Sequence, residues 1–160
     1  MNTIKHAIEI VEMDEAELTA EELRVMNVAK EATHRSYAPY SHFSVGAAVL
    51  LENGEIVSGS NQENCAYPSG LCAERTTLFY ANANYPDQPV KMLCIAARGT
   101  NGEFTEMPVA PCGACRQVMT ETEQRFNTPM RVILYGSKGI YAVQSARDLL
   151  PVCFDNDCLI

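Results

Sequence analysis

Three cysteines in two separate segments constrain the fold of this chain more than any other feature. Cys112 and Cys115 stand three residues apart, so that at the first turn of a helix both sulfurs can bind one metal ion. Cys72, at another predicted helix start, would supply a third thiolate, and helix N-termini ease the deprotonation of thiols. Three protein ligands leave one tetrahedral position open, which is typical of catalytic zinc. The fold must therefore bring two helix starts together.

Charged side chains stand beside these cysteines. Glu74 lies two residues after Cys72, where its carboxylate can exchange protons with a water molecule in the open position. Three thiolates around Zn²⁺ carry a net charge of −1, and we predict that Arg75 and Arg116 offset this charge by hydrogen-bonding to the thiolates. These residues predict a hydrolytic zinc centre.

Two other interpretations of the cysteines remain open at this point. The Cys112–Cys115 pair is also typical of a redox site, or of half a structural four-cysteine zinc site. Neither alternative accounts for the position of Glu74. The remaining thiols, any of which would be the fourth ligand of a structural site, are Cys65, Cys94, Cys153 and Cys158.

The predicted secondary structure is typical of an α/β protein. Thr19 and Glu22 form a capping-box pattern, and Asn53-Gly54 favours a type I′ hairpin turn. We expect helices at about 20–35, 72–83, 112–126 and 145–150, and strands at 45–51, 56–60, 92–97, 131–135 and 140–143. This order predicts a three-layer α-β-α sandwich with a mixed sheet of about five strands.

Length and composition narrow the choice further. A chain of 160 residues fits one domain, which we place at 14–160 after an N-terminal extension at 1–13. The net charge of −8 argues against nucleic-acid and anionic membrane partners. No apolar stretch is typical of a signal peptide or a membrane span, so seven cysteines indicate the reducing cytoplasm.

Four motifs in order resemble those of the small, homotetrameric cytidine deaminases. The resemblance covers roughly residues 20–155, and the motifs are Tyr40-Ser41-His42-Phe43-Ser44-Val45-Gly46-Ala47-Ala48, Asn61-Gln62-Glu63-Asn64, Cys72-Ala73-Glu74-Arg75 and Pro111-Cys112-Gly113-Ala114-Cys115-Arg116-Gln117. The resemblance implies hydrolytic deamination of cytidine and 2′-deoxycytidine in pyrimidine salvage, with one Zn²⁺ per chain and active sites shared within a homotetramer.

The resemblance also implies roles for single residues. Cys72, Cys112 and Cys115 would hold zinc, and Glu74 would be the proton shuttle. Asn61 and Glu63 would bind the ribose, which their i, i+2 spacing on one side of an extended segment supports. The other implied substrate contacts are the Phe43 ring, the Ala73 amide, the Ala110 carbonyl and, lent to a neighbouring subunit, Phe154.

Three other functions stay in view. An aminohydrolase for a cytosine-containing antibiotic such as blasticidin S shares the cysteine motifs. A nucleic-acid-editing deaminase is opposed by the charge of −8 and by cysteine instead of histidine in the first motif. A non-catalytic zinc-stabilised binding protein would have no open zinc position.

Overall fold

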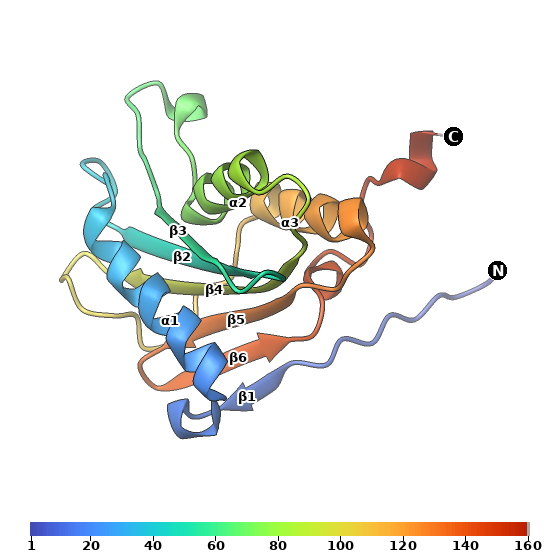
Figure 1. Cartoon of the computed structure of the whole chain (residues 1–160), viewed down its shortest axis with the longest axis horizontal. Coiled ribbons are helices and arrows are strands. Elements are labelled where there is room, and N and C mark those ends of the chain that lie inside the picture. The colour runs from blue at the N-terminus through green and yellow to red at the C-terminus, as the bar shows by residue number, and fades with distance from the viewer. Residues whose placement is uncertain (160) are drawn as a thin grey trace.

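The computed structural model describes residues 1–159 and forms three layers (Figure 1). The central sheet has six strands: β1 (Val11–Met13), β2 (Ser44–Leu51), β3 (Ile56–Ser60), β4 (Val90–Arg98), β5 (Arg131–Gly136) and β6 (Gly139–Val143). Helix α1 (Ala20–Ala32) lies on one face, and α2 (Ala73–Asn84) and α3 (Gly113–Phe126) lie side by side on the other. The predicted α/β three-layer fold with a mixed sheet is confirmed.

The strands lie in the order β1-β6-β5-β4-β2-β3 across the sheet. Strands β4 and β5 are parallel because α3 crosses over between them, and every other neighbouring pair is antiparallel. The β2–β3 hairpin continues through an irregular segment into α2, whose start therefore lies near the start of α3.

Alternating side chains of the central strands fill two hydrophobic cores. Val49 and Leu93 point to the layer of α2 and α3, where they pack with Leu78 and Met119. Neighbouring positions such as Leu50 point to α1. Because both faces are covered, β2 and β4 are apolar along most of their length, as the sequence showed.

The sixth strand, β1, was not predicted. Val11, Glu12 and Met13 pair with Ala142, Tyr141 and Ile140 of β6, so the end of the N-terminal segment joins the sheet edge. Three residues are too few to show the alternation of apolar and polar side chains that predicts a strand. Their pairing partner, β6, also lies near the other end of the chain. The division into an extension at 1–13 and a domain from 14 remains our prediction.

The hairpin between β2 and β3 is confirmed, but its predicted type I′ turn is wrong. Gly54 has φ +87°, whereas Asn53 does not adopt a positive φ. The amide of Gly54 donates to Leu51 O at 2.9 Å, and the amide of Leu51 donates to Glu55 O at 2.9 Å. A turn followed by a left-handed glycine is the pattern of a bulged hairpin, which an Asn-Gly pair also permits.

Two of the predicted helices, the first and the last, differ from expectation. The first helix ends at Ala32 and continues as a 3₁₀ turn at Thr33–Arg35, and residues Ala146–Leu149 form a 3₁₀ turn. Further 3₁₀ turns lie at Glu15–Glu17, Tyr67–Ser69 and Asn156–Leu159. In residues 1–159, no helix combines the length and apolarity needed to cross a membrane.

The capping box of α1 is extended by an ion pair. Glu22 accepts from the Thr19 amide at 2.8 Å and from Arg131 Nε at 2.7 Å, so it ties α1 to β5. Burial raises the pKa of Glu22, but hydrogen bonds from Thr19 and the charge of Arg131 outweigh burial and lower the pKa overall. The ionised carboxylate therefore stabilises the fold.

We expect a pH-dependent loss of stability in Glu22→Gln. Because the folded pKa is depressed, the ionised carboxylate contributes its full stabilisation above about pH 4.3, the ordinary glutamate pKa. The stability difference between the native protein and the variant should shrink as the pH falls below that value through the folded pKa. Urea unfolding at several pH values measures this difference. Glu21→Gln, whose partner Lys91 is 3.8 Å away and exposed, is the matched control. A difference that is constant with pH would contradict the assignment.

Gly46 allows α1 to approach the sheet. A Cβ at this position would lie 2.2 Å from Ala29 O and 2.6 Å from Thr33 N, both backbone atoms. We therefore expect Gly46→Ala to lower the free energy of unfolding by about 3 kcal/mol, at the upper end for overpacking. Gly139→Ala, whose added Cβ would lie 3.4 Å from the flexible carboxylate of Glu12, should change the free energy of unfolding far less. Equal Tm values for the two variants would exclude a tight α1–β2 contact.

Candidate active site

The two helices on one face of the sheet bring the three predicted cysteines together. Cys72 is the N-cap residue of α2, and Cys112 is the N-cap residue of α3. Cys115 lies in the first turn of α3 and is buried. Both N-cap carbonyls accept the first hydrogen bond of their helix, from Thr76 N and Arg116 N. The predicted meeting of two helix starts is therefore present in the structure.

The geometry of the sulfur atoms suits a metal ion. Cys72 Sγ lies 3.7 Å from Cys112 Sγ, and Cys112 Sγ lies 3.5 Å from Cys115 Sγ. All three sulfurs lie within 4.8 Å of one another, and within residues 1–159 no fourth cysteine, histidine or carboxylate joins the cluster. Three converging soft ligands fit Zn²⁺ with one open tetrahedral position. A four-cysteine structural site does not fit these distances.

The other cysteines are placed elsewhere. Cys94 is fully buried in the middle of β4, and Cys65 is exposed. Cys153 and Cys158 each lie within 4 Å of the carboxylate of Asp155. Among these described thiols, none takes part in the cluster.

The thiols of the cluster hold their protons unequally. A hydrogen bond from Cys115 and contacts with Arg75 lower the pKa of Cys72 to about 5, against the opposing effect of burial. The same hydrogen bond, together with burial and the Glu74 carboxylate, raises the pKa of Cys115. The first thiolate of the cluster is therefore on Cys72.

Glu74 is buried beside the cluster, with only 5% of its surface exposed. Burial raises the pKa of its carboxyl group, and the negative charge of Cys72 acts in the same direction. A carboxyl group whose pKa is raised toward neutrality can both accept and donate a proton. Because Glu74 is the second residue of α2, the helix places it close to Cys72 without making it part of the three-sulfur group.

The two arginines differ from each other. Arg75 reaches Cys72, with 3.7 Å between Arg75 Nη2 and Cys72 Sγ, and Arg75 Nε is buried without a partner in the described structure. Arg116 instead donates to Pro111 O and Leu149 O, both at 2.8 Å. In the described structure Arg116 therefore makes no hydrogen bond to the three sulfurs, because the fold brings the Pro111 and Leu149 carbonyls to its guanidinium group.

An open pocket of about 540 Å³ lies beside Cys72 and Arg75. Asn61 and Glu63, the two residues expected to bind a ribose, line it together with Tyr40 and Tyr67. The two tyrosine rings meet edge to face at a centroid distance of 6.1 Å. The pocket places a carboxylate, an amide and a guanidinium group next to the cluster.

Asn61 is largely engaged within the fold. Its Oδ1 accepts from Val45 N at 2.8 Å and from Ser36 Oγ at 2.6 Å, and its Nδ2 donates to Phe43 O at 2.9 Å. An amide oxygen has two lone pairs and an NH₂ group has two hydrogens, so one N–H of Asn61 remains for a ligand.

The remaining predicted substrate residues are not gathered in this pocket. Ala73 is buried at the start of α2, and Phe43 is half-buried. Ala110 lines a separate hollow of about 310 Å³ with Arg116 and Ile8. Phe154 is 61% exposed on the C-terminal segment, which projects away from the sheet (Figure 1). A single chain therefore does not bring Phe43, Ala110 and Phe154 to the pocket.

Ser41 is a residue whose role the sequence did not indicate. It lies in the pocket and hydrogen-bonds to Glu63. Its position in the Tyr40–Ala48 motif was the available signal, but only the structure places it against residue 63.

The comparison with protein families agrees with this geometry. Residues 19–128 match the family model described as "Cytidine and deoxycytidylate deaminase zinc-binding region". This range includes the three cysteines and Glu74. The fold and the site therefore define the chain as an enzyme of the deaminase class, and the non-catalytic alternative is set aside.

Relatives and solved structures identify the family. The chain is 42% identical over 131 residues to cytidine deaminase of Sporosarcina psychrophila, covering 82% of this chain and 89% of the relative. It is 44% identical over 126 residues to that of Halalkalibacterium halodurans, covering 79% and 88%. The crystal structure of cytidine deaminase from Burkholderia pseudomallei matches with a TM-score of 0.72 and 39% identity, over 86% of this chain and 100% of that one. The chain belongs to the cytidine and deoxycytidylate deaminase family.

Proposed function

We propose that this enzyme hydrolyses the 4-amino group of cytidine and 2′-deoxycytidine, giving uridine or deoxyuridine and ammonia. The observation that carries the proposal is the buried carboxylate of Glu74 beside three thiols that converge within 4.8 Å. The relatives named cytidine deaminase support a free nucleoside as substrate. The reaction would serve pyrimidine salvage in the cytoplasm.

Cys72, Cys112 and Cys115 would hold one Zn²⁺ per chain. When bound, zinc supplies a Lewis acid that makes a water molecule acidic enough to act as a nucleophile near neutral pH. The guanidinium group of Arg75 would offset part of the negative charge of the thiolates, since it already contacts Cys72 Sγ. Arg116 would act only by fixing the Pro111 carbonyl before Cys112.

Glu74 would move the protons of the reaction. It accepts one proton from the attacking water and delivers it to ring N3 while the oxygen bonds to C4. It then carries the second proton to the 4-amino nitrogen, which leaves as ammonia, and the C4 carbonyl forms. The buried position keeps the carboxyl pKa raised, as this shuttle needs.

The pocket residues would hold the nucleoside. The free N–H of Asn61 would donate to a ribose hydroxyl, and the Glu63 carboxylate would accept from one. Phe43 would pack against the nucleoside, while the Ala73 amide and the Ala110 carbonyl would contact the pyrimidine. Because Phe154 is exposed and does not line the pocket of its own chain, it would act in a neighbouring subunit of a homotetramer.

Substrate profiling tests this proposal. We expect loss of the ultraviolet absorbance of the 4-aminopyrimidine with cytidine and 2′-deoxycytidine, and far slower loss with blasticidin S or cytosine in single-stranded DNA. The acidic charge of −8 disfavours the DNA substrate. Faster turnover of blasticidin S than of either nucleoside would replace the proposal with an antibiotic-directed aminohydrolase.

A further inference from the structure

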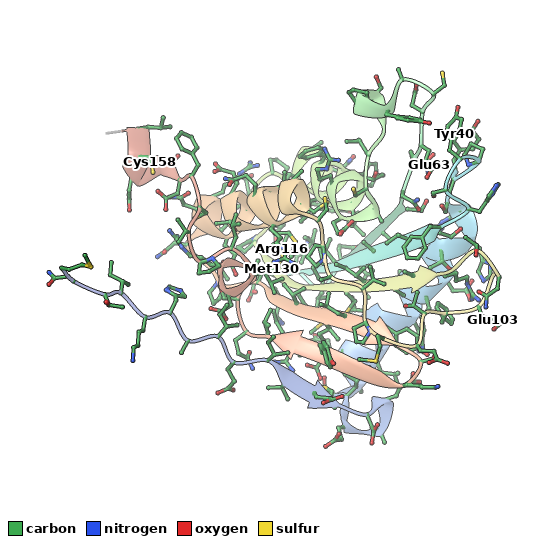
Figure 2. The ribbon with its side chains drawn as sticks, turned by 180° about the vertical axis from the view of Figure 1, so that it is seen from behind. Tyr40, Glu63, Glu103, Arg116, Met130 and Cys158 are labelled. Carbon is green, nitrogen blue, oxygen red and sulfur yellow. The ribbon has the colours of Figure 1, made fainter. Side chains whose placement is uncertain are left out.

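Glu63, the proposed acceptor for a ribose hydroxyl, is held by a loop that is distant in sequence. Its Oε2 accepts from the backbone amides of Tyr40 at 2.9 Å and Ser41 at 3.2 Å, and its Oε1 accepts from the Ser41 hydroxyl. Figure 2 shows Tyr40 and Glu63 close together at one end of the molecule, on separate segments. Three donors thus converge on one carboxylate at the pocket wall.

The backbone of this loop is shaped for the contact. His42 adopts a left-handed φ of 53°, and its amide donates to Ala38 O at 3.0 Å. Successive backbone N–H groups before a left-handed residue form a concave nest that binds anions. Because histidine adopts a positive φ only at an energetic cost, the surrounding contacts must hold the loop in this form.

The Ser41 hydroxyl has a defined direction. Its oxygen accepts from Phe43 N at 3.1 Å, so its single proton is free to point at Glu63. A serine hydroxyl that already accepts one hydrogen bond donates its proton to the carboxylate, and that carboxylate must be an acceptor. The Ser41 hydroxyl accordingly lowers the pKa of Glu63, with the two backbone amides acting in the same direction. Ser41 therefore connects the backbone of Phe43 to the acceptor at residue 63.

We propose that Ser41 is a positioning residue for sugar recognition, which orients the ionised Glu63 carboxylate toward the ribose hydroxyls. Oε2 of Glu63 already accepts from two amides, whereas Oε1 accepts only from the Ser41 hydroxyl and keeps a second lone-pair direction for a sugar hydroxyl. Without the Ser41 proton, the carboxylate keeps its amide donors at Oε2 but loses the partner that fixes Oε1. This inference rests on the proposed nucleoside deamination.

The prediction concerns discrimination between sugars. Ser41→Ala should reduce the preference for cytidine over 2′,3′-dideoxycytidine, measured as the ratio of kcat/KM values, by about tenfold, the size of one charge-assisted hydrogen bond. Ser41→Thr, which keeps a hydroxyl, should restore most of the preference. If Ser41→Ala folds poorly, Ser41→Cys takes its place, because a thiol is close in size to the hydroxyl but is a weaker donor. Ser41→Cys should then reduce the preference for cytidine in the same way.

Repeating the substitution in the Glu63→Gln variant shows whether Ser41 acts through Glu63. In Glu63→Gln, the further change Ser41→Ala should alter the ratio by less than about twofold, because the carboxylate it orients is gone. Metal content per chain should be unchanged in every variant.

Any of four outcomes would overturn the inference. Equal losses on both substrates would make Ser41 a merely structural residue. An undiminished effect in the Glu63→Gln background would show that Ser41 acts through another group. Native protein that deaminates neither substrate would overturn the proposed function itself, and the Ser41 inference with it, whereas native turnover with an unchanged ratio in Ser41→Ala overturns the inference alone.

Discussion

Glu74→Gln is expected to lower kcat for cytidine by about 10²–10⁴-fold, the usual contribution of a positioned acid/base group. Glutamine fills the same buried volume but cannot carry a proton from water to N3 and on to the amino group. The raised pKa of the native carboxyl suits both transfers, and the amide has no equivalent titration. Steady-state kinetics together with metal analysis of the same sample measures the effect.

The matched control for this substitution is Glu121→Gln on the exposed face of α3. It makes the same chemical change outside the site and should leave kcat near the native value. Glu74→Gln should bind as much zinc as native protein, because Glu74 is not part of the three-sulfur cluster. Near-native turnover by Glu74→Gln with a full metal complement would refute the proton-shuttle assignment.

Removing one thiol of the cluster should lower activity about as much as Glu74→Gln does, because it weakens zinc binding. Cys112→Ser leaves two thiols, and a serine hydroxyl is a poor ligand for zinc at neutral pH. We expect zinc affinity to fall by more than about a hundredfold, beyond the 10–100-fold loss typical of partners that only support a ligand. Activity should fall in parallel after dialysis against a chelator.

Cys158→Ser provides the comparison, because it removes an exposed thiol that lies near Asp155 and outside the cluster. This variant should retain the native zinc-to-chain ratio through the same dialysis. Equal zinc retention and activity in Cys112→Ser and Cys158→Ser would mean that the cluster is not the metal site.

Most of the fold could be predicted because its signals are local. The Thr19 capping box marks the start of α1, and apolar runs mark β2, β4 and β5. The convergence of Cys112 and Cys115 also followed from spacing, since two residues three apart in a first helical turn face the same point. These predictions need no knowledge of distant contacts.

Other features depend on tertiary partners that spacing does not reveal. Arg116 was expected at the thiolates, but the carbonyl of Leu149 reaches it from a segment more than 30 residues later. Strand β1 exists only because β6 offers an edge for pairing.

The buried carboxylate of Glu123 is a similar case. It accepts from Met130 N, Ala146 N and the Ser145 hydroxyl, so it fixes the entry to β5 and the turn after β6. In the sequence it is an ordinary helical glutamate. Its structural role could not be predicted, because its donors come from two later segments of the chain.

The most direct test of the whole account is a zinc titration of metal-stripped protein with cytidine present. Uridine, ammonia and bound zinc would be quantified at each point. We predict that activity rises linearly with bound zinc to one ion per chain, with one uridine and one ammonia formed for each cytidine consumed. Full activity in metal-stripped protein, or one bound zinc per chain without deamination, would contradict the account.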